Sequence, residues 1–200
     1  MIVNESIRAA IYCVIFLLLL GTIEGVVRRF GISTDYSRRL AHIVASLFGI
    51  LIWSQFSPLV FLVCTSILVG IIALSYAKRI LRSVHNVRRK TYGEVFLPLG
   101  ILVTYLIAYQ RPEVFIPAIL ITCFADVAGG IISDIRNQGR PSKLGSLGFI
   151  IVTYIILVVC GQGYAAAALI AFVIMATERI SPYGSDNFTV PIAAAVLLLL

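Results

Sequence analysis

The chain contains 200 residues, of which 60% are hydrophobic and only 12% are charged, and its net charge is +7. Soluble domains are about 45–50% apolar and about 25% charged. The composition therefore excludes an ordinary soluble enzyme and a disordered chain, and it predicts a single integral-membrane domain spanning 1–200. An excess of Lys and Arg is typical of the cytoplasmic loops of membrane proteins, so no nucleic-acid partner is expected.

Stretches without charged side chains mark the expected membrane spans. The first, roughly 9–27, lacks a small-residue cleavage site and is expected to be a retained helix rather than a signal peptide. The uncharged stretch Leu40–Ala77 has 38 residues, and as one helix it would be about 57 Å long, twice the hydrocarbon thickness. A turn is therefore expected at Ser54–Pro58, and a similar stretch, Leu144–Thr177, is expected to turn at Gly161–Gly163.

Three further spans, 94–109, 114–133 and 188–200, complete an all-α, polytopic transmembrane bundle of about eight helices. With the N-terminus outside, the inside loops hold 14 of the 16 Lys and Arg residues. The positive-inside rule therefore predicts an outside N-terminus. The four cysteines are scattered without a CxxC pair, which predicts neither a disulfide framework nor a zinc site. The expected inside loops are 28–39, 77–93, 134–147 and 178–187.

An acidic residue inside an apolar span is the clearest candidate for a functional site. Asp126 lies about seven residues before the inner end of its span, which is about 10 Å below the rim. A charge in hydrocarbon costs at least about 2.5–3.5 kcal/mol and so indicates function by default. Gly129, Gly130 and Ser133 follow on the same helix face, which lets a ligand or a helix approach the carboxylate. A purely structural Asp126 is the alternative interpretation.

Other polar residues are expected at a similar depth, near cytoplasmic helix ends. Each alone has an ordinary structural explanation, such as complementing a helix dipole. Their shared depth predicts that these residues and Asp126 line one cleft, which opens to the cytosol. These residues are Glu24, His42, Glu94, Ser146, Glu178, Asp186 and Asn187.

Carboxylates beside arginines at a membrane rim suit phosphoryl transfer. In that chemistry acidic residues hold Mg²⁺ and cations neutralise phosphate oxygens. The basic clusters of the inner loops are candidates for binding a nucleoside triphosphate; contacts to anionic lipid head groups are the alternative. The sequence contains neither a Walker A loop nor a GxGxxG motif. The clusters are Arg38-Arg39, Arg88-Arg89-Lys90, and Arg136 with Arg140 and Lys143.

Five segments resemble the polyprenol/phytol kinase family, which includes dolichol kinase and CTP-dependent diacylglycerol kinase. Arg38–Ile43 resembles its Arg-Lys-x-x-His-Ile segment, and Phe124–Ile132 resembles its Gly-Asp-x-x-Ala helix. Gly145–Phe149 resembles the end of a Lys-Ser-x-Glu-Gly-Ser motif. The most specific match, Glu178–Pro191, resembles a Glu followed by Asp-Asn-x-x-x-Pro at the last helix, and Tyr92–Gly100 is a weaker match.

The resemblance covers about 38–195 and implies a multi-helix membrane enzyme. Such an enzyme transfers a phosphoryl group from CTP or ATP to an isoprenoid alcohol or diacylglycerol at the cytoplasmic face. The logic of phosphoryl transfer predicts that Asp126, with Glu178 or Asp186, holds Mg²⁺, and that Asp126 or His42 is the catalytic base. The residues it implies for nucleotide binding are Arg38, Arg39, Lys143, Gly145, Ser146 and Asn187.

Two positions depart from the family pattern. Ser133-Asp134-Ile135 stands where the family has Gly-Arg-Arg, and Leu144 replaces the Glu of the motif before Gly145. Two other functions stay open. A CTP-dependent phospholipid cytidylyltransferase would release pyrophosphate instead of a nucleoside diphosphate. A non-catalytic lipid-binding or transport protein ranks lower, because the polar residues lie at one rim and no internal repeat occurs.

Overall fold

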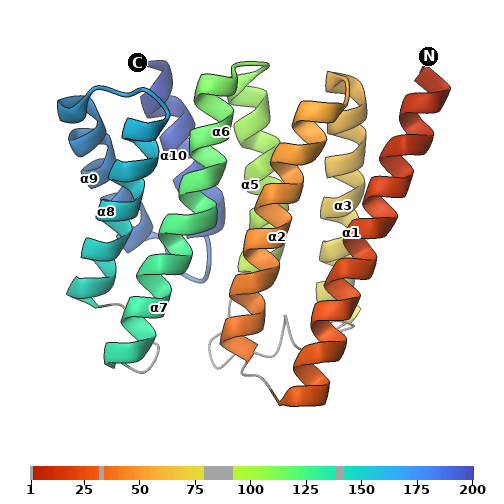
Figure 1. Cartoon of the computed structure of the whole chain (residues 1–200), viewed down its shortest axis with the longest axis horizontal. Coiled ribbons are helices and arrows are strands. Elements are labelled where there is room, and N and C mark those ends of the chain that lie inside the picture. Colours follow the sequence, from red (N-terminus) through yellow and green to blue (C-terminus); the bar gives the residue numbers. More distant parts are fainter. Residues whose placement is uncertain (1, 32–33, 79–91, 138–141) are drawn as a thin grey trace.

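The computed structural model describes residues 2–31, 34–78, 92–137 and 142–200, and all regular structure in these ranges is helical (Figure 1). In these described ranges eight rods stand roughly parallel, and the two marked ends of the chain lie at the same end of the bundle. One rod is continuous from α6 through the π-helix η1 into α7. The helices are α1 (Ile2–Phe30), α2 (Thr34–Gln55), α3 (Pro58–Lys78), α5 (Gly93–Ala108), α6 (Pro112–Leu120), η1 (Ile121–Ala125), α7 (Asp126–Asn137), α8 (Lys143–Val159), α9 (Tyr164–Ile180) and α10 (Asp186–Leu199).

The two turns expected inside the long uncharged stretches are confirmed. Helix α2 ends at Gln55, and Pro58 begins α3, where proline fits because a first-turn N–H has no helical partner. Helix α8 ends before Cys160, and Gly161 has a φ of 92°, a left-handed conformation that favours glycine. These breaks let each long uncharged stretch fold back as two helices, and the described residues form the predicted all-α bundle. The orientation of the bundle in a membrane stays a prediction.

Helices extend further than the uncharged stretches that predicted them. Helix α1 begins at Ile2 rather than near residue 9, and α2 begins at Thr34 rather than at Leu40. The expected inside loop 28–39 is therefore mostly helical, and this boundary was wrong. Charged side chains end the apolar run without ending the helix, because Arg and Glu are good helix formers. The basic residues of 79–91, and Arg140, lie outside the described residues.

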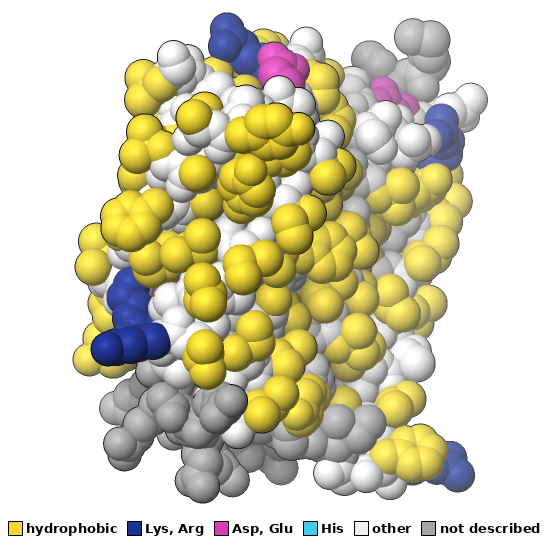
Figure 2. Space-filling model, turned by 60° about the vertical axis from the view of Figure 1, so that its left-hand side comes forward, with side chains coloured by type: hydrophobic (Ala, Val, Ile, Leu, Met, Phe, Trp, Pro, Cys, Tyr) yellow, Lys and Arg dark blue, Asp and Glu magenta, His cyan; other side chains and the backbone are white. Residues whose placement is uncertain are grey.

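The outer surface of the bundle is apolar over most of its height. Figure 2 shows hydrophobic side chains covering the middle of this face, with the blue Lys and Arg groups towards its two ends. Among the described residues, three helical stretches are long and apolar enough to cross a membrane: Asn4–Val27, Pro58–Lys78 and Pro112–Ile135. A protein that crosses a bilayer needs an apolar outer surface of this kind.

The buried residues of the described ranges form two apolar clusters. The main cluster surrounds the aromatic side chains of Phe61, Tyr105 and Phe115, whose ring centroids lie 4.3–6.1 Å apart. A smaller cluster joins the second half of α1, including Phe16, to Leu68 of α3 and to α2. Helices α1 and α5 each pack against both α2 and α3. The boundary between the two clusters therefore lies among these four helices.

Helix α10 packs closely against α5, and this contact holds the last helix in the bundle. A Cβ on Gly100 would lie 2.4 Å from the carbonyl oxygen of Asn187 and 3.1 Å from the Cα of Phe188. These neighbours are backbone atoms, which cannot rotate away. Gly100 is therefore required for the position of the first turn of α10.

Substituting Gly100→Ala is expected to lower the free energy of unfolding by about 1–3 kcal/mol, the usual cost of overpacking. Thermal unfolding in detergent would measure it. Gly70→Ala is the matched control, because nothing lies within 4 Å of a Cβ at that exposed position of α3, and alanine is the better helix former. Equal melting temperatures for the two variants would contradict the close contact between α5 and α10.

Candidate functional site

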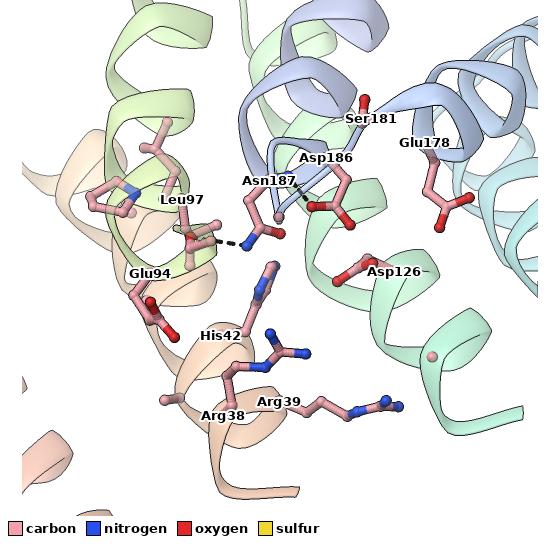
Figure 3. A pocket seen from close by; sticks show the side chains of 18 of the residues that line it. Arg38, Arg39, His42, Glu94, Leu97, Asp126, Glu178, Ser181, Asp186 and Asn187 are labelled. Atoms are coloured by element: carbon pink, nitrogen blue, oxygen red, sulfur yellow. Dashed lines mark hydrogen bonds between the residues drawn. The ribbon is translucent and has the colours of Figure 1, made fainter. Parts of the chain in front are cut away.

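Three carboxylates from three helices meet in one place. Asp126 lies at the start of α7, Glu178 in the last turn of α9 and Asp186 at the start of α10. One oxygen from each lies within 4.8 Å of the others, and all three side chains are half-buried. Figure 3 shows them converging. Three carboxylates this close repel one another strongly unless a cation lies between them.

A π-helical turn precedes Asp126 and changes the helix locally. It occupies Ile121–Ala125, and the Thr122 carbonyl within it accepts a hydrogen bond from Nε2 of buried His42 at 3.1 Å. Since a carbonyl can only accept, His42 carries its proton on Nε2. Such turns occur frequently at functional sites. Asp126, Gly129, Gly130 and Ser133 then share the face that lines the cavity, as their spacing predicted.

A tight turn between α9 and α10 brings Glu178 and Asp186 together. Tyr183 and Gly184 have φ values of 56° and 82°, and this left-handed backbone reverses the chain within a few residues. The Ser181 hydroxyl donates to the Thr177 carbonyl at 2.7 Å and lies 2.6 Å from the Thr189 hydroxyl. The turn is therefore fixed on both helices that carry the carboxylates.

The two arginines of α2 have different surroundings. Arg39 forms an ion pair with Asp134 of α7 at 2.5 Å and donates to the Val127 carbonyl at 3.4 Å. Gly130 makes room for it, because a Cβ there would lie 2.7–2.9 Å from the guanidinium. Arg38 extends toward the space between His42 and Asp126 in Figure 3. Asp134, which departs from the family pattern, is thus the ion-pair partner of Arg39, one of the residues expected to bind a phosphate.

The start of α8 is already capped. Ser142 is its N-cap, and its side-chain oxygen accepts a hydrogen bond from the Gly145 N–H at 2.8 Å. The Gly145 N–H, predicted to help hold a phosphate, is therefore engaged. Ser146 lines the cavity and accepts a hydrogen bond from Arg179 at 3.3 Å. Lys143 is exposed and does not line the cavity, so the structure does not bring it to the site.

Asn187 joins two parts of the site. Its Nδ2 donates to the Gly93 carbonyl at 3.0 Å, and its backbone N–H donates to the Asp186 carboxylate at 3.0 Å (Figure 3). The backbone N–H of Tyr92 donates to the Tyr183 carbonyl at 2.9 Å nearby. Asn187 thus holds the start of α5 against the turn that carries Asp186.

These side chains line one cavity of about 570 Å³, within the usual range of small-molecule sites. The cavity has a polar end, formed by residues of α2, α5, α7, α8, α9 and α10, and it continues between apolar side chains. Glu24 of α1 is buried outside the lining, unlike the other residues predicted for the cleft. The predicted residues of the polar end are Arg38, Arg39, His42, Glu94, Asp126, Gly145, Ser146, Glu178, Asp186 and Asn187.

Several residues that contribute to the polar end were missed by the sequence interpretation, Asp134 and Ser142 among them. Asp134 stood out as a departure from the family, yet nothing in its spacing showed that it faces Arg39. Ser142 precedes the apolar run of α8, and a serine at that place is the usual N-cap signal. The role of Asp134 could be found only from the contact between α2 and α7.

Comparison with known proteins supports the family resemblance. A phytol kinase of Synechocystis sp. is 25% identical over 181 residues, which cover 82% of this chain and 78% of that protein. No family model matches the chain. No solved structure matches it significantly either. The chain is thus a distant homologue of a protein named phytol kinase, in agreement with the segments that resemble the polyprenol/phytol kinase family.

Proposed function

We propose that the protein is a multi-pass membrane kinase that transfers a phosphoryl group from a nucleoside triphosphate to a lipid alcohol. The observation that carries the proposal is the convergence of Asp126, Glu178 and Asp186 beside Arg38, at the polar end of a cavity that continues into apolar surroundings. The distant phytol kinase homologue supports the same chemistry. An isoprenoid alcohol is the proposed acceptor class, and CTP the proposed donor.

The carboxylate oxygens of Asp126, Glu178 and Asp186 fit Mg²⁺, which prefers hard oxygen ligands and is usually held together with substrate phosphates. When bound, the ion supplies positive charge that compensates both the carboxylates and the phosphate oxygens. Arg38 is proposed to bind the phosphates directly. Arg39, which is held by Asp134, is proposed to contribute positive charge at the polar end of the cavity.

His42 is proposed as the base that accepts the proton of the lipid hydroxyl. Its Nε2 donates to the Thr122 carbonyl, so Nδ1 is left as the acceptor. A carboxylate that holds a cation is a poor base, which argues against Asp126 in both roles. Asn187 acts as a positioning residue, because its side chain holds Gly93 while its backbone N–H holds Asp186.

The bundle is proposed to cross the membrane several times with this site near the cytoplasmic face. The three long apolar helices support membrane insertion. The proposed side follows from the excess of Lys and Arg in the expected inside loops.

Purified protein in lipid, supplied with Mg²⁺, CTP or ATP and a panel of lipid alcohols, tests the proposal. We expect release of a nucleoside diphosphate together with a phosphorylated lipid alcohol. The panel and the two nucleotides would identify acceptor and donor in one experiment. Release of pyrophosphate with formation of a CDP-lipid would instead identify a cytidylyltransferase. Folded protein that forms neither product would overturn both enzymatic readings.

A further inference from the structure

The cavity continues beyond the carboxylates as an apolar arm. Apart from Phe149 of α8 and Tyr183 of the turn before α10, the apolar side chains that line the cavity in the described part of the chain come from α1, α2, α3 and α5. We define the apolar arm by six of the residues that surround it: Phe16, Phe48, Ile52, Thr65, Leu68 and Ile101.

The arm lies where the apolar interior divides. Phe16 and Leu68 belong to the smaller cluster, whereas Ile52 and Ile101 belong to the main one. Protein interiors are normally packed without voids much larger than a water molecule. A cavity between two apolar clusters exposes surface that water does not stabilise. An apolar ligand in the arm would complete the packing between the two clusters, and this would explain why the core is divided.

One face of α2 leads from the polar end along the apolar arm. His42, Ala45, Gly49 and Ile52 follow one another at steps of three or four residues, and all line the cavity. Ten residues of helix separate His42 from Ile52, a rise of about 15 Å. A Cβ on Gly49 would lie 3.2 Å from Ile101. Helices α2 and α5 are thus in close contact at Gly49, beside the arm.

We propose that the apolar arm binds the hydrocarbon tail of a single-chain lipid alcohol and holds its hydroxyl beside His42 and the three carboxylates. This inference rests on the proposed function. It adds where the lipid alcohol binds and that this alcohol has one hydrocarbon chain. The cavity of about 570 Å³ has to hold the reacting polar groups as well as the hydrocarbon, which suits one tail. A lipid with two acyl chains would need a second path.

Filling the arm with a larger side chain tests the proposal. Ala45→Phe adds a ring about a third of the way from His42 to Ile52, and Ala168→Phe makes the same change on the exposed face of α9. In Ala45→Phe, kcat/KM for a C20 isoprenoid alcohol is expected to fall at least about 10-fold more than kcat/KM for a C5 alcohol, as expected for lost contacts in an apolar pocket. Ala168→Phe should leave both unchanged. Equal losses for the two alcohols in Ala45→Phe would overturn the assignment.

A direct binding measurement separates the arm from the activity. A C20 alcohol carrying a diazirine at its far end is photolysed with the protein in lipid, and labelled peptides are identified by mass spectrometry. We expect labels on α2, α3 and α5 around Ile52, lost in Ala45→Phe and retained in Ala168→Phe. This result with no phosphorylated product would refute the kinase but keep the tail site. Labels on outward-facing residues alone, or stronger competition by diacylglycerol than by unlabelled C20 alcohol, would refute the tail site.

Discussion

Replacing Asp126 by Asn is expected to reduce phosphoryl transfer at least about 100-fold, the usual scale for losing a group that stabilises charge in the transition state. The substitution removes one of the three carboxylates that lie within 4.8 Å of one another. It changes no side-chain volume, so the helix contacts of Gly129 and Ser133 stay in place. Steady-state rates for the wild type and the variant in the same lipid give the measurement.

Thermal unfolding of the same two proteins separates a metal role from a folding role. Without Mg²⁺ the Asp126→Asn variant should be at least as stable as the wild type, because repulsion among the carboxylates is relieved. With Mg²⁺ the wild type should gain stability through binding, and the variant should gain much less. Glu113→Gln is the control, since Glu113 is exposed at the start of the same rod. Wild-type turnover in Asp126→Asn would remove this carboxylate from the mechanism.

Replacing Arg38 by Gln is expected to raise KM for the nucleotide about 10-fold to 100-fold. Arg38 extends toward the carboxylates in the cavity (Figure 3), and a hydrogen bond to a charged group contributes about 1.5–3 kcal/mol. The melting temperature should change little, because a half-buried side chain facing a polar cavity contributes little packing. Nucleotide titrations at saturating lipid alcohol measure the effect.

The neighbouring Arg39→Gln substitution serves as the contrast. Arg39 is paired with Asp134, so its loss leaves a half-buried carboxylate without its cation. The free energy of unfolding is expected to fall by about 1–3 kcal/mol, and Asp134→Asn in the same chain should restore part of it. An Arg38→Gln variant that loses stability as Arg39→Gln does, with an unchanged KM, would reassign Arg38 to the framework of the bundle.

Much of the architecture could be predicted because the hydrophobic spans are long and their breaks are chemically distinct. Pro58 and Gly161 stop helices for local reasons that need no tertiary information. Helix ends were harder, because Arg38 and Arg39 continue α2 although they end its uncharged stretch. The limit of an apolar segment is not the limit of its helix.

The candidate site was predictable where one helix carries several of its residues. Asp126, Gly129 and Gly130 share a face through helical spacing alone, and the structure places all three along the cavity. The ion pair between Arg39 and Asp134 joins residues 95 positions apart, so no local pattern could reveal it.

The division of the apolar interior also bears on how the protein opens. Ala9 joins the first half of α1 to the main cluster, while the second half, from Phe16 to Val27, is held by the smaller cluster. Separating that half from the bundle exposes less apolar contact than separating any part of the continuous rod around Phe115. Native proteins open in units whose free energies follow such local burial. Amide protons in the second half of α1 should therefore exchange with solvent deuterium faster than those of α6, and a bound tail should slow the former selectively.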